Sequence, residues 1–179
     1  MLDEYVEGPV QRISPEAPVP ILEVQRRWHR LGGAANVAHG LAVLGAEVRL
    51  CGVVGDDRPG EALLAACAEV GIDTRALGRC PGEPTARKLR VVARHQQLLR
   101  MDWERPLPPA AIAEAAIERL LEGEADALIL SDYAKGFLST PRLRRLIDVA
   151  RGRGLPVLVD PKGRDFGRYR GATVATPNR

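Results

Sequence analysis

Short apolar runs alternate with amphipathic or small-residue stretches over most of the chain, and this alternation predicts strands and helices in turn. The apolar runs in 46–54, 125–136 and 155–163 are continuous, as is typical of parallel strands that are buried on both faces. The stretches predicted as helices are 34–45, 60–71, 108–123 and 139–154, and a further strand begins in 171–178. This order indicates an α/β fold with a mostly parallel sheet that carries helices on both faces.

Two extended segments interrupt this order. Residues 4–25 contain three prolines between positions 15 and 20, which exclude a helix there. Residues 84–104 have strand character and are expected to form a hairpin around His95 and Gln96. We therefore interpret the whole chain, residues 1–179, as one α/β domain with a small β subdomain built from these two segments.

Composition narrows the class of protein. The formal net charge is +3 and the arginines are dispersed, so the short clusters at 26–30 and 142–146 are expected to be solvated helix or loop faces rather than a nucleic-acid surface. No apolar run reaches the roughly 20 residues of a membrane helix, and the first ten residues do not resemble a signal peptide. Three cysteines without metal-type spacing fit a reducing compartment. We expect a cytoplasmic protein without membrane or nucleic-acid partners.

Candidate chemistry gathers where the predicted strands end. In an open parallel sheet, ligands bind beyond the carboxyl ends of the strands. Loops are polar in any protein, which would explain one polar strand end, but three successive ones favour a site. Only three of the 26 basic residues are lysines, and a lysine ammonium suits phosphate binding. The candidate residues at the strand ends are Asp132, Lys135, Asp160, Lys162 and Asn178, and the third lysine is Lys88.

A second candidate element is the stretch "GGAAN", which contains Gly32, Gly33 and Asn36. Glycines let the backbone approach a ligand closely, and an asparagine amide can both donate to and accept from a sugar hydroxyl. The alternative is an ordinary glycine turn before a packed helix. The stretch matches neither the dinucleotide fingerprint nor the P-loop, so neither of those sites is predicted.

The motifs "GGAANVA", "SDYAKG", "DPKG" and "TPN" together resemble the ribokinase (PfkB-type) family of sugar kinases. The stretches "RISPEAPVP" and "RHQQLLRMD" are more specific, and within the family they resemble the kinase domains of the bifunctional heptose 7-phosphate kinases and heptose 1-phosphate adenylyltransferases. The resemblance covers nearly the whole chain in order. It implies transfer of the γ-phosphoryl group of ATP, with Mg²⁺, to the anomeric hydroxyl of heptose 7-phosphate, a step in making ADP-heptose for the lipopolysaccharide core.

The resemblance also implies roles for individual residues. Asp3, at the end of the first core strand, and the Gly32, Gly33 and Asn36 element would hold the sugar, while the β segments 4–25 and 84–104 would form a lid over it. Lys88 would meet the substrate phosphate, with Arg87 and Arg90 as alternatives. The phosphate and Mg-ATP side would hold the five strand-end residues, Asp132, Lys135, Asp160, Lys162 and Asn178, without a direct metal ligand. Lid sheets in this family often pair between subunits, which implies a homodimer formed through the lid.

The chain departs from the family pattern at one important motif. The catalytic base of the family lies in a Gly-Ala-Gly-Asp type motif, and this sequence contains neither that motif nor a substitute. We therefore expect no catalytic residue within these 179 residues, a fold cut at both ends, exposed apolar segments, poor solubility and no kinase activity for this stretch alone. Two other interpretations stay open: a ribokinase-type kinase for another phosphosugar, and a non-catalytic fragment that binds a sugar phosphate.

Overall fold

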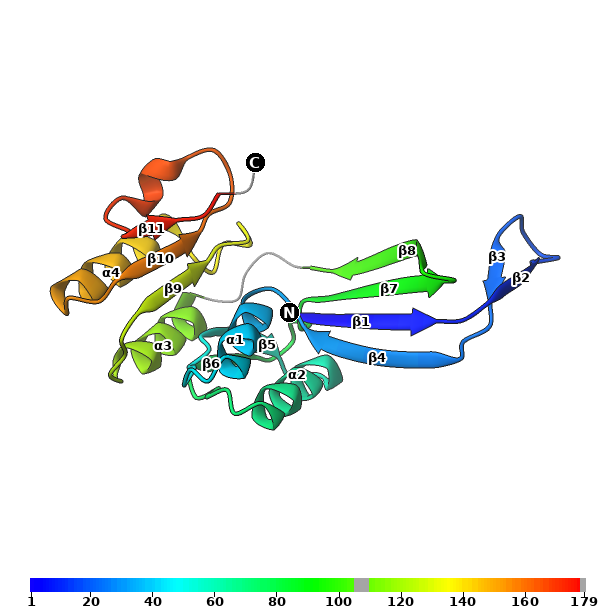
Figure 1. Cartoon of the computed structure of the whole chain (residues 1–179), viewed down its shortest axis with the longest axis horizontal. Helices are drawn as coiled ribbons and strands as arrows, with labels where there is room; N and C mark the ends of the chain where they lie inside the picture. The colour runs from blue at the N-terminus through cyan, green and yellow to red at the C-terminus, as the bar shows by residue number, and fades with distance from the viewer. Residues whose placement is uncertain (105–109, 178–179) are drawn as a thin grey trace.

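A long antiparallel and parallel sheet extends from the helical part of the molecule in the computed structural model, which describes residues 1–104 and 110–177 (Figure 1). Its four strands lie in the order β4-β1-β7-β8. β1 pairs in parallel with β7, while β4 and β8 run antiparallel to their neighbours. A two-stranded ribbon, β2 with β3, continues at the far end of this sheet (Figure 1). The bounds of these strands are β1 Leu2–Glu7, β2 Val10–Ile13, β3 Pro20–Leu22, β4 Arg26–Leu31, β7 Arg87–Ala93 and β8 Gln96–Trp103.

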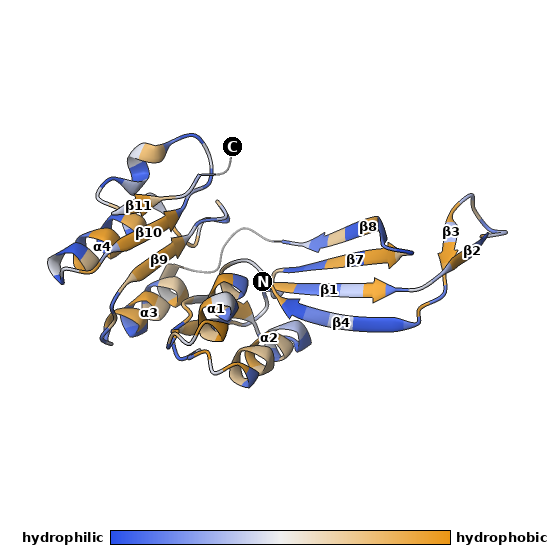
Figure 2. Ribbon diagram, viewed as in Figure 1, coloured by the Kyte–Doolittle hydropathy of each residue, from blue (hydrophilic) through white to orange (hydrophobic). Residues whose placement is uncertain are grey.

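This four-stranded sheet, named the lid sheet after its expected role, takes in residues of both extended segments and adds a strand that was not expected. Residues 26–30 form part of β4, so the prediction of a helix or loop face there is wrong. Figure 2 shows why the pattern was hard to interpret, because β4 is hydrophilic along most of its length. Its main aromatic residue, Trp28, stacks on Tyr5 of β1 with ring centroids 5.0 Å apart and an interplanar angle of 4°. This segment is a strand because it pairs with β1. Its own sequence has no alternation of apolar and polar residues from which a strand could be predicted.

The hairpin between β7 and β8 forms as predicted, one residue earlier than its expected centre. The two turn residues are Arg94 and His95, with φ values of 46° and 70°. Positive φ at both central residues gives the turn a twist that matches the flanking strands.

The remaining strands form two parallel ladders instead of the single sheet that was expected. One has the order β11-β10-β9 and the other pairs β5 with β6. Within the described residues no strand joins the two ladders, because β1 belongs to the lid sheet. The bounds are β5 Gly52–Gly55, β6 Leu77–Cys80, β9 Leu128–Ser131, β10 Val157–Asp160 and β11 Val174–Ala175, with a short 3₁₀ helix at Phe166–Tyr169.

The described residues include four α-helices close to the predicted ranges: α1 Ala34–Val43, α2 Arg58–Glu69, α3 Ala110–Leu121 and α4 Thr140–Gly152. α1, α2 and the inner ends of β1 and β4 enclose one core cluster, around Leu2, Leu31 and Leu63. α4, β9 and β10 enclose the other, which also receives Ile117 of α3. The α/β fold class is confirmed, and the common edge at which the polar strand ends lie follows from the parallel ladder β11-β10-β9.

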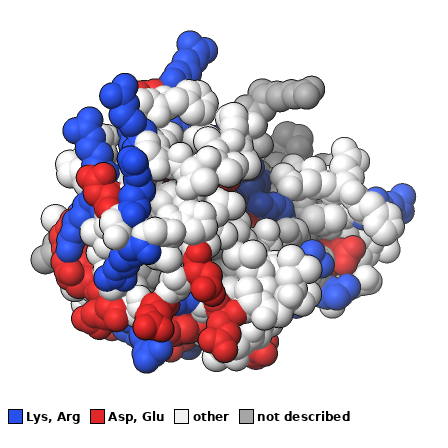
Figure 3. Space-filling view, turned by 60° about the vertical axis from the view of Figure 1, so that its left-hand side comes forward, with Lys and Arg blue, Asp and Glu red and all other residues white. Residues whose placement is uncertain are grey.

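The basic cluster at 142–146 lies in α4, as expected for a solvated helix face. Arg142 and Arg145 form ion pairs with Glu114 of α3, and Arg145 also pairs with Glu118. Basic and acidic side chains accordingly lie next to one another on the face shown in Figure 3.

The apolar strands are less exposed than expected. Leu130, Val157 and Val159 are buried by the helices, while Ile129 of β9 and Val174 of β11, at 38% and 46% exposed, show the expected exposure. Among the helices that the structure describes, none is long and apolar enough to cross a membrane.

Candidate sugar-binding site

Asp3 of β1 lies with its carboxylate against the backbone of Gly32. A Cβ atom at position 32 would be 2.6 Å from Oδ2 of Asp3, so a larger residue would displace the carboxylate. Oδ1 of Asp3 accepts a hydrogen bond of 2.7 Å from Nη1 of Arg90. The expectation that Asp3 ends a core strand is wrong, because β1 pairs with β4 and β7 and so belongs to the lid sheet. Asp3 therefore lies where the lid meets the helical part.

Gly33 connects β4 to α1 and brings a second loop to the same corner. Its φ of 58° is a conformation that glycine adopts readily and other residues resist. The ring of Tyr133, in the loop after β9, lies 3.6 Å from the position that a Cβ of Gly33 would take. Asn36 is exposed in the first turn of α1, and its backbone N–H donates to the carbonyl of Gly33 over 2.9 Å. The structure thus brings Asp3, Gly32 and Gly33 together, with Asn36 one helical turn away.

Lys88 of β7 is held by two carboxylates. Its Nζ donates to Oδ2 of Asp102 and to Oε1 of Glu104, both over 2.6 Å. Burial alone would lower the pKa of Lys88, but these two contacts outweigh it, and the net effect raises the pKa. The pKa of Asp102 is lowered, first by its hydrogen bond from Lys88 and further by one from Arg100. Lys88 therefore stays charged, but its charge is already matched by neighbouring carboxylates.

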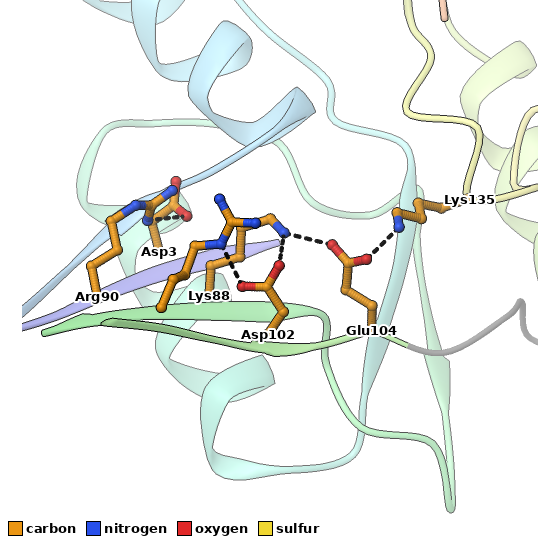
Figure 4. Close-up of polar contacts among 7 residues, drawn as sticks. Asp3, Lys88, Arg90, Asp102, Glu104 and Lys135 are labelled. Atoms are coloured by element: carbon orange, nitrogen blue, oxygen red, sulfur yellow. Dashed lines mark hydrogen bonds and ion pairs between the residues drawn. The ribbon is translucent and has the colours of Figure 1, made fainter. Parts of the chain in front are cut away.

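Glu104 links the lid to the loop that follows β9. Its Oε2 accepts a hydrogen bond from Nζ of Lys135, so an unbroken row of charged contacts runs from Asp102 through Lys88 and Glu104 to Lys135 (Figure 4). The hydrogen bonds from Lys135 and Lys88 lower the pKa of Glu104. Lys88, Glu104 and Lys135, together with Gly33 and Tyr133, line one end of a cleft of about 1250 Å³ whose other walls come from α1, β5, β9 and α4.

Asp132, which follows β9, is buried, and its carboxylate accepts hydrogen bonds from neighbouring residues of the chain. Its Oδ2 accepts a hydrogen bond of 2.6 Å from the hydroxyl of Tyr169, and its Oδ1 accepts one of 2.8 Å from the N–H of Ala134. Nη2 of Arg168 is 3.6 Å from the same carboxylate. Burial and the hydrogen bond to Asp132 raise the pKa of Tyr169. Asp132 therefore shapes the loop that carries Tyr133 and Lys135.

The other strand-end residues lie beside Asp132. Asp160 ends β10 in register with Ser131, and its carbonyl accepts a hydrogen bond of 3.0 Å from the N–H of Asp132. Lys162 is exposed two residues later, and its N–H is 3.2 Å from the hydroxyl of Tyr169. Asn178, predicted for the same edge, lies outside the described residues.

Several residues at the site were not singled out from the sequence: Asp102, Glu104 and Tyr169, together with Arg100. The sequence pattern of the hairpin could have identified some of them. If 87–93 is a strand, Lys88 and Arg90 share a face, and the hairpin partner must place alternate residues of 96–103 beside them. The contact between Tyr169 and Asp132 had no signal, since 37 positions separate the two residues.

Known proteins resemble this chain over nearly its whole length. The profile of the pfkB family carbohydrate kinases matches residues 2–179. The chain is 52% identical to the bifunctional protein HldE of Magnetococcus marinus and 52% identical to the D-beta-D-heptose 7-phosphate kinase of Bordetella bronchiseptica, in each case over 100% of this chain. It spans 38% of the length of the first relative and 56% of the second.

Solved structures with the same fold include sugar kinases of low sequence identity. The tetrameric inhibited form of phosphofructokinase-2 from Escherichia coli aligns over 98% of this chain and 57% of its own, with a TM-score of 0.71 and 21% identity. The Arabidopsis thaliana ribokinase complexed with ribose and ATP aligns over 98% of this chain and 56% of its own, with a TM-score of 0.67 and 16% identity. These likenesses show a ribokinase-like fold.

Proposed function

Because this chain belongs to the pfkB family of carbohydrate kinases, we propose that it supplies the sugar-binding part of an enzyme that phosphorylates heptose 7-phosphate at its anomeric hydroxyl, using ATP. The observation that carries this proposal is the 52% identity to a D-beta-D-heptose 7-phosphate kinase over the whole chain. The corner formed by Asp3 and Gly32 supports it, because a partly exposed carboxylate beside a bare backbone can accept hydrogen bonds from sugar hydroxyls. The cytoplasmic location and the place of this reaction in making ADP-heptose belong to the same proposal.

The residues of the site would act mainly by positioning. Asp3 would hold sugar hydroxyls, with Gly32 and Gly33 allowing the sugar to approach the backbone and Asn36 reaching it from α1. Lys135 would place its ammonium beside the transferring phosphoryl group once it leaves Glu104, because a cation there offsets the negative charge that gathers on that group. A general base would take the proton of the anomeric hydroxyl.

The residues at the strand ends would contact Mg-ATP without binding the metal ion directly. Asp160 ends β10, and Lys162 follows it two residues later and is exposed. Among residues 1–104 and 110–177 no group of three or more His, Cys, Asp or Glu side chains could hold a metal ion. Asp160 would act on the water shell of Mg²⁺, which keeps several of its waters when it binds with substrate phosphates. ATP supplies the phosphoryl group, and the metal offsets its negative charge. Asp132 would orient the loop and not contact the metal, since both of its oxygens already accept hydrogen bonds.

We propose in addition that the 179-residue chain alone binds the sugar without transferring phosphate, because its sequence contains no Gly-Ala-Gly-Asp type motif. We also propose that the lid sheet forms a homodimer contact. Its face opposite Asp3 carries Leu89, Leu99 and Met101 at alternating and paired positions, and the last two are 54% and 38% exposed. Light scattering on the L99E variant tests the dimer, which should dissociate.

The kinase proposal is tested with protein expressed from the complete reading frame that encodes these residues. Heptose 7-phosphate should raise the melting temperature more than ribose or fructose 6-phosphate does, and should support release of ADP from ATP. The Asp3→Asn variant should lose both effects. Preferential turnover of fructose 6-phosphate would establish another phosphosugar kinase, and sugar-phosphate binding without turnover would establish a non-catalytic binding protein.

A further inference from the structure

Two arginines face each other across the hairpin of the lid sheet. Arg90 of β7 and Arg100 of β8 are direct partners in the antiparallel register. Side chains at such positions start about 5 Å apart, and like charges there reduce the stability of a sheet. The face that carries this pair is the one that carries Asp3, Lys88 and Asp102, because positions two apart on a strand share a face. The fold itself gives no reason for placing two guanidinium groups there.

Neighbouring carboxylates hold the two guanidinium groups but leave donors free. Arg90 gives Nη1 to Oδ1 of Asp3, and Arg100 gives Nε to Oδ1 of Asp102 over 2.8 Å. Each guanidinium has five N–H donors, so most of them remain available within the part of the chain that the structure describes. The side chains of Arg90 and Arg100 are 22% and 49% exposed, so an anion in solution can reach them.

The other basic residues of the hairpin are less suited to an anion. Lys88 is held by two carboxylates, Asp102 and Glu104. Arg87 lies on the opposite face, where it pairs with Glu4 and covers the ring of Trp103 with its Cζ 3.7 Å from the ring centroid. Of the three candidates that the sequence offered for a phosphate, Arg90 is the one with free donors on the same face as Asp3.

Aromatic side chains fix the position of Arg90. Across the sheet, Trp28, Tyr5, Arg90 and Arg100 form one row, because Tyr5 pairs with Trp28 on one side and with Arg90 on the other. Cζ of Arg90 is 5.3 Å from the centroid of the Tyr5 ring, and the Tyr5 ring stacks on Trp28. A guanidinium held against an aromatic ring loses little further freedom when it binds a ligand.

The row lies one step farther from the helical part than Asp3. Successive residues on one face of a strand are about 7 Å apart, and β1 runs outward from the N-terminus (Figure 1). Lys135 lies on the inner side of Asp3, toward the strand ends, so the reacting end of a bound sugar faces inward and its other end faces the row (Figure 4).

We propose that Arg90 and Arg100 together bind the phosphate group that the sugar substrate already carries, and so select a phosphorylated sugar over the free sugar. This inference rests on the proposed function, since it assumes that a phosphosugar occupies the corner at Asp3. Two adjacent guanidinium groups can hold phosphate oxygens with several parallel N–H···O bonds, a geometry for which arginine is better suited than lysine. Lys88 keeps Asp102 and Glu104 in place beside the pair.

The test compares two sugars on protein from the complete reading frame. Calorimetry gives the dissociation constants of heptose 7-phosphate and of unphosphorylated heptose, and their ratio measures selection for the phosphate. Arg90→Gln and Arg100→Gln should each weaken binding of heptose 7-phosphate by about tenfold or more. Because Arg90 also holds Asp3, the cleaner variant is Arg100→Gln, which should leave the affinity for free heptose within about threefold. Arg87→Gln, on the same strand but the opposite face, is the matched control and should keep the ratio.

The outcomes separate this inference from the proposed function. If the unchanged protein binds heptose 7-phosphate tightly but both glutamine variants keep its ratio, the arginine site is wrong and the kinase proposal stands. The arginine site is also wrong if Lys88→Met removes the selection for the phosphate while Arg90→Gln and Arg100→Gln both keep it. If the unchanged protein prefers a hexose 6-phosphate, the kinase proposal is wrong, and loss of that preference in Arg100→Gln still supports the arginine site. If it binds no sugar phosphate, both are overturned.

Discussion

Asp3 and Gly32 occupy adjoining space, with Oδ2 of Asp3 where a side chain at position 32 would begin, 2.6 Å from the position of a Cβ atom. Gly32 is buried, and its N–H donates a hydrogen bond of 3.0 Å to the carbonyl of Met1. The glycine and the carboxylate therefore depend on each other: the bare backbone makes room for the carboxylate that we assign to the sugar.

Gly32→Ala should damage the site and the fold together. The added methyl group must push the Asp3 carboxylate away, which weakens its hydrogen bond to Arg90. We expect a loss of about 1–3 kcal/mol in the free energy of unfolding, as is usual for an overpacked position, and loss of sugar binding. Urea unfolding and calorimetry measure the two effects.

Gly40→Ala is the matched control for that variant. Gly40 lies in α1, is exposed, and has no atom within 4 Å of the position that a Cβ would take. Alanine is the better helix former, so this change should raise the free energy of unfolding by up to about 1 kcal/mol. A stable Gly32→Ala protein with unchanged sugar affinity would contradict the role given to this contact.

The contact between Glu104 and Lys135 should make stability depend on pH in the acid range. The pKa of Glu104 is lower in the folded protein than in the unfolded chain, where it is about 4.3. The stabilisation is therefore complete above pH 4.3, roughly the unfolded-state value, and is lost as the pH falls through the folded-state pKa. Above that range Glu104→Gln should lower the free energy of unfolding by about 1 kcal/mol, and below it the two proteins should converge.

Measuring that difference needs a control for the lost charge. Glu69 is exposed at the end of α2 and forms no ion pair with the described residues, so Glu69→Gln removes a carboxylate without breaking such a contact. Thermal unfolding of the three proteins between pH 3 and 7 compares them. A constant difference between the original protein and Glu104→Gln over the whole range would show that the charged contact is not responsible.

Tyr169→Phe should loosen the loop that carries Lys135. It removes the hydroxyl that donates to Asp132 and leaves a carboxylate that is only 3% exposed with one partner fewer. The expected loss is about 1–3 kcal/mol in the free energy of unfolding, the usual result of leaving a buried acceptor unpaired. Tyr5→Phe, which removes a hydroxyl without a hydrogen bond to the described residues, should change stability by much less. Equal effects in the two variants would argue against the role of the Asp132 contact.

Thr85→Val tests a buried link between α2 and the start of the lid. The hydroxyl of Thr85 donates to Asp57 and accepts from the N–H of Gly55 over 2.9 Å, and the residue is 2% exposed. Valine has the same shape as threonine but cannot make either hydrogen bond. We therefore expect the free energy of unfolding, measured with a chemical denaturant, to fall by about 2 kcal/mol. Thr74→Val, at a partly buried threonine without such bonds among residues that the structure describes, should be nearly neutral. A neutral Thr85→Val would show that water replaces both bonds.

Features of the site that depend on residues close together in the sequence could be predicted, and features that depend on distant residues could not. The polar strand ends could be predicted together because parallel strands end at one edge, and the ladder β11-β10-β9 brings Asp132 and Asp160 to that edge. The strand character of β4 could not be predicted, since most of its side chains are polar and exposed and its pairing with β1 is a long-range contact. The hydrogen bond between Tyr169 and Asp132 could not be predicted either, because β10 and the 3₁₀ helix must fold back to bring Tyr169 next to Asp132.

The amino-acid sequence by itself determined the α/β class, the positions of the helices, the hairpin of β7 and β8 and the family, because these depend on local periodicity, turn residues and motif order. The tertiary structure alone decided which charges are free. Lys88 is matched by two carboxylates, while Arg90 and Arg100 face each other with donors to spare. Strand register sets that difference, because a shift of one residue would turn each of these side chains to the other face of the sheet.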